Sequence, residues 1–334
     1  MRHFVFTAPT TLNLKAIAGF KMTAKQYSMS QSNVQGFTLL FAHGLGAHKE
    51  QWEPTIQYLF KGAINSNLIR EAWSFDWPSH GDAAILNQDI LNAQEGRTVS
   101  ICDWGSIIDA FINSTIMIGH RIILIGHSGG GGAVTMATES FHKSSPVRAL
   151  IVIEPNMATE EIWNPHWEDR MIALNLCVGG TLTRRDSWPS KDQAYNYFNH
   201  RMPWKRWDIR MLRILTEFGL EELPSRSCRL KCSKVQEAAG FVEIQSYFAA
   251  TRQFSRICRV LPSHIIWGEN YDNPFIPKFM KEFTSKLYEQ YVSTTIIQST
   301  GHMVLQEQPD KLAQRIEDII TKINPGTYQQ LSKL

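Results

Sequence analysis

One serine of the sequence lies in a pattern that is typical of a catalytic nucleophile. Residues 126–130 read Gly-His-Ser-Gly-Gly, a G-x-S-x-G motif with Ser128 at its centre. An apolar run, 121–126, precedes the motif and a segment led by glycine and alanine follows it, so a strand is expected to turn into a helix at Ser128. A turn this sharp leaves no room for side chains at Gly126 and Gly130. The motif therefore predicts a strained, exposed serine at the end of a strand.

A serine hydroxyl is a weak nucleophile until a base accepts its proton, so a histidine is required elsewhere in the chain. His302 follows Gly301 between the last predicted strand, 293–298, and a predicted amphipathic helix, 309–323. Because strands and helices alternate in this part of the chain, His302 is expected at the sheet edge that also carries Ser128. We predict that His302 is the base.

Two carboxylates qualify as the acid that orients the histidine and stabilises its charged form. Glu154 ends the apolar run 149–153, at a place where a buried carboxylate is costly unless it is paired. Asp272 follows the next apolar run, 264–268. Both satisfy the chain order serine, acid, histidine. We favour Glu154 slightly, and both residues remain candidates.

Acyl transfer places negative charge on the carbonyl oxygen, which backbone amides must stabilise. The amide of Gly129 is one expected donor, and the amide of Leu45, in the glycine-rich loop His43-Gly44-Leu45-Gly46, is the other. The same loop does not fit a dinucleotide site, because the G-x-G-x-x-G pattern would require glycine where the chain has Lys49.

Cofactor and metal sites find little support in the sequence. The glycines at 129–132 are not followed by the Lys-Ser/Thr of a phosphate loop, and no H-E-x-x-H motif occurs. Cys228 and Cys232 have no second pair of cysteine or histidine at finger spacing. We therefore expect no cofactor and no metal.

The elements that must position these residues alternate between short apolar runs and segments of helical period. Six runs are predicted as strands: 36–42, 72–76, 121–126, 149–153, 264–268 and 293–298. Runs rich in Ile, Val and Leu without polar alternation are typical of parallel strands that helices cover on both faces. The chain is thus predicted to be an α/β protein with a parallel sheet.

One long interval interrupts this alternation. Residues 157–258 contain no clear buried strand, and many of their tryptophan and tyrosine residues lie among basic ones. We predict that 157–258 is a helical cap inserted into a core formed by 1–156 and 259–331. Since ligands of such sheets bind at the carboxyl ends of the strands, the cap is expected to act as a lid over the site.

Length, charge and cysteine usage exclude several classes of protein. The chain has 334 residues and a net charge of +3, without a run of like charges, so no nucleic-acid partner is expected. Its apolar stretches are too short to span a membrane, and its N-terminus lacks the apolar segment of a secretory signal. Five scattered cysteines fit reduced thiols in an intracellular compartment.

The last three residues, Ser332, Lys333 and Leu334, form the tripeptide that peroxisomal import receptors bind. This signal is short, but it is specific to its position in the chain. We therefore expect a peroxisomal protein that has the import receptor as a partner.

These motifs together resemble the α/β-hydrolase superfamily over most of the chain. The resemblance rests on the His43-Gly44 loop, residues 75–82 (Phe-Asp-Trp-Pro-Ser-His-Gly-Asp), the motif around Ser128 and Gly301-His302. It implies an α/β-hydrolase fold, with a mostly parallel central sheet, helices on both faces and a helical lid.

Two further features are similar to the fungal peroxisomal hydrolases, a group with a yeast peroxisomal lipase and enzymes of host-selective toxin biosynthesis. They are Ile-Glu-Pro at 153–155 and the terminal Ser-Lys-Leu. Some members of the superfamily take the acid after the strand that Glu154 ends and others take it after the next strand. Segment 268–272 has one residue more than the common Gly-x-x-Asp pattern, which counts against Asp272.

The expected activity is that of a serine hydrolase. It would cleave an ester, thioester or lactone of a small hydrophobic or polyketide-like substrate through an acyl-enzyme on Ser128, in line with a role in fungal toxin metabolism. One alternative is hydrolysis of a carbon–carbon bond in a diketone-type substrate by a similar triad. Another is a protein without catalytic activity that binds an apolar ligand under the cap.

Overall fold

Eight strands form the central sheet in a computed structural model, which describes residues 1–10, 17–29, 33–62, 68–93, 98–271 and 276–323. Their order is β1-β2-β4-β3-β5-β6-β10-β11. The two pairs formed by β2, with β1 and with β4, are antiparallel, and the pairs from β4 to β11 are parallel. The strands are β1 (Arg2–Thr7), β2 (Lys21–Ser28), β3 (Phe37–Ala42), β4 (Ile69–Phe75), β5 (Arg121–His127), β6 (Val147–Ile153), β10 (Ser263–Gly268) and β11 (Val292–Ile297).

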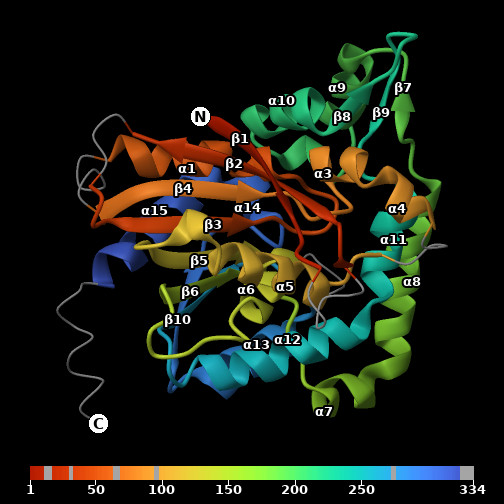
Figure 1. Cartoon of the computed structure of the whole chain (residues 1–334). Coiled ribbons are helices and arrows are strands. Elements are labelled where there is room, and N and C mark those ends of the chain that lie inside the picture. The colour runs from red at the N-terminus through yellow and green to blue at the C-terminus, as the bar shows by residue number, and fades with distance from the viewer. Residues whose placement is uncertain (11–16, 30–32, 63–67, 94–97, 272–275, 324–334) are drawn as a thin grey trace.

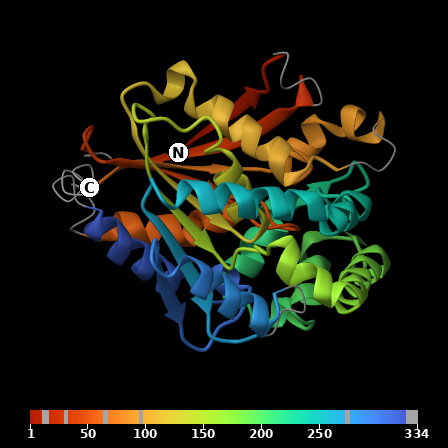
Figure 2. The same cartoon turned by 90° about the horizontal axis from the view of Figure 1, so that it is seen from below.

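Helices cover both faces of this sheet, as the view from below shows (Figure 2). One face packs against α5 (Ile101–Ile112), α6 (Gly129–Met136), α12 (Ile244–Ile257) and α13 (Lys278–Tyr288). The other face packs against α1 (Glu53–Lys61), α14 (Val304–Glu307) and α15 (Pro309–Lys322). The prediction of an α/β protein with a mostly parallel sheet between two helical layers is confirmed.

Strand β5 shows why its apolar run lacks polar alternation. Ile122 and Leu124 belong to the apolar cluster on one face of the sheet, and Ile123 and Ile125 belong to the cluster on the other. Successive side chains of a strand point to opposite faces, so a strand buried on both faces needs an apolar residue at every position.

Residues between β6 and α12 form a separate group of elements at the end of the sheet toward which β3 and β4 point (Figure 1). This group includes a short antiparallel sheet in the order β7-β9-β8. Its elements are α7 (Glu160–Trp163), η4 (Asn164–His166), α8 (Trp167–Thr183), β7 (Ser187–Trp188), α9 (Lys191–Asn199), η5 (Trp204–Arg206), α10 (Ile209–Phe218), β8 (Leu220–Glu222), β9 (Cys228–Leu230) and α11 (Lys234–Val242).

Three features of the fold differ from the sequence-based expectations. Strands β1 and β2 and the small sheet were not predicted. β1 lies at the edge of the sheet, β2 mixes polar with apolar residues, and the strands of the small sheet have only two or three residues each. Helix α12, which the prediction assigned to the cap, packs against α5 and α6 and contributes Phe248 and Phe254 to the main apolar cluster. The six predicted strands all occur, with bounds that differ by a few residues.

The remaining short helices lie in the connections between strands. They are η2 (Lys49–Trp52), α3 (Gly81–Leu86), α4 (Gln88–Ala93) and η3 (Thr115–Met117). All five cysteines are free thiols. Among the described residues, no helix has both the length and the apolar character that crossing a membrane requires.

Candidate active site

Ser128 lies at a sharp turn between β5 and α6, in a backbone conformation that side chains rarely adopt. Its φ is 53° and its ψ is −120°. A Cβ on Gly126 would lie 2.3 Å from the carbonyl oxygen of Gly130, and a Cβ on Gly130 would lie 2.3 Å from the carbonyl oxygen of Ala42. Only glycine fits at either position, as the motif predicted. The strain is offset by the packing of α6 on β3 and β5, which holds the hydroxyl at the sheet edge.

The structure brings Ser128, His302 and Glu154 together. The Oγ of Ser128 lies 3.1 Å from Nε2 of His302, and Nδ1 of His302 lies 3.3 Å from Oε2 of Glu154. Glu154 directly follows β6 and also has a positive φ, 48°. With Nδ1–H donating to the carboxylate, Nε2 is left to accept the serine proton, which is the arrangement a general base needs.

The carboxylate of Glu154 is fully buried yet ionised. Burial opposes the charge, but the hydrogen bond and charge of His302 and the charge of Lys281 outweigh it and hold the pKa of Glu154 below its usual value. Its Oε1 accepts hydrogen bonds from the Gly268 amide and from Nζ of Lys281, each at 2.6 Å. A negative charge is therefore available to stabilise a protonated His302.

Asp272, the other predicted acid, lies outside the described residues. Two observations favour Glu154 over Asp272. Glu154 contacts His302, and the sequence spacing around Asp272 departs from the common pattern.

The two predicted oxyanion donors lie beside Ser128. Gly129 is the first residue of α6, where backbone N–H groups have no partner within the helix. A Cβ on Gly44 would lie 3.1 Å from Cβ of Ser128, so the loop that carries Leu45 packs directly on Ser128. Leu45 and Gly129 line the same cavity as Ser128.

The Leu45 loop is fixed on both sides by residues that the sequence analysis did not assign. The amide of Gly46, whose φ is +75°, donates to Nε2 of His80 at 3.0 Å. On the other side, a Cβ on Gly240 of α11 would lie 2.5 Å from Cδ1 of Leu45. Helix α11 and the loop after β4 thus both contact the loop that carries the predicted oxyanion donor, Leu45.

His127, inside the G-x-S-x-G motif, also has a role that the motif does not reveal. Burial and the neighbouring His302 lower its pKa to about 3, so its imidazole is neutral. Its Nε2–H donates to the carbonyl oxygen of His302 at 2.8 Å. The end of β5 therefore anchors the backbone of the loop that carries His302.

A cavity of about 380 Å³ opens in front of Ser128 and His302. Its walls come from the loops around the main sheet and from the group of elements between β6 and α12. Most of the residues in these walls are apolar or aromatic. The apolar lining includes Leu45, Trp77, Ile101, Met202, Phe241, Ile276 and Met303. The polar exceptions include Asn156, Tyr247 and an ion pair between Arg206 and Glu307, whose Nε and Oε1 atoms lie 3.0 Å apart.

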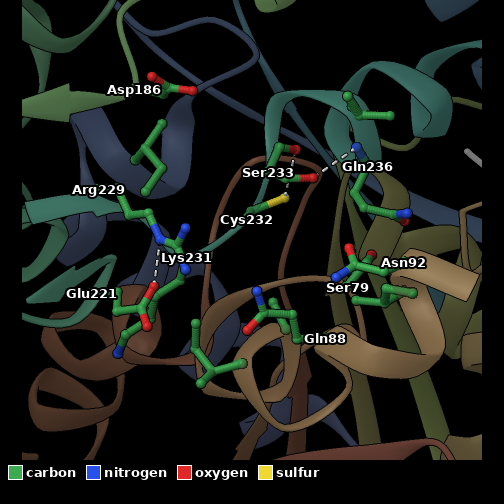
Figure 3. Close-up of a pocket in the computed structure, with 15 residues that line it drawn as sticks. Ser79, Gln88, Asn92, Asp186, Glu221, Arg229, Lys231, Cys232, Ser233 and Gln236 are labelled. Atoms are coloured by element: carbon green, nitrogen blue, oxygen red, sulfur yellow. Dashed lines mark hydrogen bonds and ion pairs between the residues drawn. The ribbon is translucent and has the colours of Figure 1, made fainter. Parts of the chain in front are cut away.

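A second cavity, of about 430 Å³, lies between α3, α4, the small sheet and α11. Figure 3 shows the ion pair between Arg229 and Glu221, which are neighbours on β9 and β8 at the wall of this cavity; their Nε and Oε2 atoms lie 2.6 Å apart. None of the predicted catalytic residues lines this second cavity. Within the described ranges, no group of three or more His, Cys, Asp or Glu residues is placed to hold a metal ion.

Most of the chain matches the model of one protein family. A model of the alpha/beta hydrolase family matches residues 39–315. This range runs from β3 through Ser128 and His302 into α15. Among curated proteins, no match was found.

Solved structures with the same fold cover nearly the whole chain. The peroxisomal alpha-beta-hydrolase Lpx1 from Saccharomyces cerevisiae is 20% identical, with a TM-score of 0.73 over 96% of this chain and 88% of that one. E-2-(acetamidomethylene)succinate hydrolase is 17% identical, with a TM-score of 0.68 over 90% and 95%. A thioesterase domain from the curacin biosynthetic pathway is 14% identical, with a TM-score of 0.62 over 90% and 96%.

Proposed function

Since the chain belongs to the alpha/beta hydrolase family and is therefore a hydrolase, we propose that it cleaves an ester, thioester or lactone through an acyl-enzyme on Ser128. The observation that carries this proposal is the hydrogen-bonded series from Ser128 through His302 to the ionised Glu154. A neutral, oriented imidazole next to a serine at a sheet edge is what activation of the hydroxyl requires.

In the proposed mechanism Ser128 attacks the carbonyl carbon while its proton moves to Nε2 of His302. The oxygen of the tetrahedral intermediate carries the negative charge, which the amides of Leu45 and Gly129 stabilise. The protonated His302 then gives its proton to the leaving oxygen or sulfur. In the second half, His302 accepts a proton from water as the water oxygen attacks the acyl carbon. The bond between the acyl carbon and Oγ of Ser128 then breaks, the proton returns from His302 to Oγ, and the carboxylic acid leaves.

The proposed substrate is a hydrophobic acyl compound of small to moderate size. Support comes from the cavity next to Ser128, whose largely apolar walls bury hydrocarbon or aromatic groups more readily than charged ones. A polyketide-like chain satisfies the same requirement. The residues of the cap that line this cavity, Met202 and Phe241 among them, would then act as a lid that excludes water.

Hydrolysis of p-nitrophenyl esters of increasing acyl length tests the proposal. We expect a burst of p-nitrophenol close to one equivalent, followed by slower turnover, with a preference for acyl chains longer than acetate. Ser128→Ala and His302→Ala should each lose about 10³-fold or more of kcat. A diketone assayed in parallel separates this reaction from carbon–carbon bond cleavage. Ester hydrolysis that survives both substitutions would overturn the proposal.

Import into peroxisomes through Ser332, Lys333 and Leu334 is part of the same proposal, although these residues lie outside the described part of the chain. One structure with the same fold is described as a peroxisomal hydrolase. A fluorescent protein fused to the N-terminus should show peroxisomal foci with the intact chain and diffuse signal without the last three residues. Equal distributions would contradict this assignment.

A further inference from the structure

A buried lysine contacts the carboxylate of Glu154 on the side away from His302. Lys281 belongs to α13 and is 4% exposed. Its Nζ lies 2.6 Å from Oε1 of Glu154 and 3.3 Å from each of the carbonyl oxygens of Gly268 and Asn270. These three acceptors match the three hydrogens of an ammonium group, so the lysine is satisfied as a cation.

The two oxygens of Glu154 consequently have separate partners. Oε1 accepts from the Gly268 amide and from Lys281, and Oε2 faces Nδ1 of His302. Two donors on Oε1 fix the rotation of the carboxylate, which keeps Oε2 directed at the imidazole. Without Lys281, the negative charge of Glu154 would act on His302 alone. The fixed positive charge of Lys281 offsets part of it.

We propose that Lys281 is a positioning residue of the triad, which locks the Glu154 carboxylate and offsets its charge, so that His302 remains a neutral proton acceptor at lower pH. This inference rests on the proposed function, in which His302 is the base for Ser128. An unshared carboxylate at this distance favours the protonated imidazole, which cannot accept the serine proton. With Lys281 present, this effect is smaller.

The other ionisable groups around the triad do not replace this cation. His127, from β5, is neutral because burial lowers its pKa to about 3. Arg206 of η5 and Glu307 of α14 form an ion pair at the cavity wall, so their charges largely cancel. The carboxylate of Glu269 accepts a hydrogen bond from the Ser299 amide. The other close neighbours of Lys281 are the uncharged rings of Trp267 and Tyr271, whose centres lie 5.3 and 5.4 Å from its Nζ. Among the described residues, the basic side chains within 4.0 Å of Glu154 are Lys281 and His302.

The rate at which a fluorophosphonate inactivates the enzyme, measured against pH, tests this role without knowledge of the substrate. The wild type is compared with Lys281→Met, which removes the charge, and Lys281→Arg, which keeps it. Lys278→Met is the matched control, because Lys278 lies on the same helix but is exposed and paired with Glu282 at 3.5 Å.

The expected result is an upward shift of the acidic limb of the profile by about one pH unit in Lys281→Met. The limb of Lys281→Arg should stay close to that of the wild type, and Lys278→Met should match the wild type. A folded Lys281→Met protein with the wild-type limb would overturn the inference. A wild-type protein that is not modified at Ser128 would instead overturn the proposed function, so the two failures are distinguishable.

Loss of Lys281 leaves a buried carboxylate with one cation fewer, which can prevent folding. In that case Glu154→Gln is compared with the double variant Glu154→Gln/Lys281→Met, which has no unpaired charge at this place. The acidic limb of the double variant is expected at higher pH than that of Glu154→Gln. Coinciding limbs in this pair would equally contradict a role for the lysine charge.

Discussion

At the scale of single residues, we propose that Glu154 is the acid of the triad. Its Oε2 faces His302 at 3.3 Å and its Oε1 is held by Gly268 and Lys281. Replacement by glutamine keeps the shape but removes the charge that stabilises a protonated imidazole. We expect Glu154→Gln to lower kcat for ester hydrolysis by about 10³- to 10⁴-fold and Asp272→Asn to change it little. Steady-state kinetics of the two variants decide the assignment, and the reverse pattern would transfer the role to Asp272.

The sequence located some of these residues better than others, for physical reasons. Ser128 is marked by glycines that the backbone itself requires, and His302 by its place after a strand. The acid has no comparable local constraint, so Glu154 and Asp272 were equivalent by order alone. Lys281 was missed, although it shares the buried face of α13 with Met280, Thr284 and Tyr288, and a lysine on such a face requires a partner.

At the scale of elements, the contact between α6 and the sheet fixes the position of Ser128. A Cβ at Gly130 would meet two backbone oxygens, those of Ala42 and His43, at 2.3 and 2.4 Å. We expect Gly130→Ala to destabilise the protein by about 3 kcal/mol or more, since neither backbone can yield without moving α6 or β3. Urea unfolding followed by circular dichroism measures the change.

Gly179 in the middle of α8 is the matched control for Gly130. An added Cβ there has no atom within 4 Å, so Gly179→Ala should stabilise the protein by about 0.4–1 kcal/mol through the unfolded chain and helix propensity. Equal unfolding midpoints for Gly130→Ala and the wild type would show that the close approach of α6 to β3 is not as described.

Two of the features that were not predicted, β1 and the small sheet, give weak signals in the sequence. Strand β1 exposes every second residue or more and pairs along one edge only, so its composition differs little from that of a loop. The strands of the small sheet are too short to show a period. Conversely, the parallel strands at the centre, which are buried on both faces, were all predicted.

At the scale of the whole molecule, buried neutral histidines make the stability depend on pH. Burial lowers the pKa of His43 to about 4 and that of His127 to about 3. In the unfolded chain both titrate near 6.5, so below that pH the unfolded state binds more protons than the folded state. Above about pH 6.5 these groups make their full contribution to the stability. That contribution is lost as the pH falls toward the folded-state pKa values of about 4 for His43 and about 3 for His127.

Denaturant midpoints measured from pH 8 to pH 4 test this dependence. We expect little change above about pH 7 and a steady decrease below about 6.5, of roughly 1.4 kcal/mol per unit for each histidine. His127→Asn should show a smaller decrease than the wild type, because one of the histidines with a lowered pKa is gone. A midpoint that stays constant between pH 7 and pH 5 would contradict the burial of neutral imidazoles.

The central claim is that the Ser128 hydroxyl is the nucleophile, activated by His302. Its most direct test is mass spectrometry of the full chain after treatment with a fluorophosphonate, followed by peptide mapping. We expect one equivalent of label, located on Ser128. The label should be absent from Ser128→Ala and slow to form in His302→Ala. It should be unchanged in Ser299→Ala, the matched control at another serine with positive φ. Label on a different residue, or full labelling of Ser128→Ala, would contradict it.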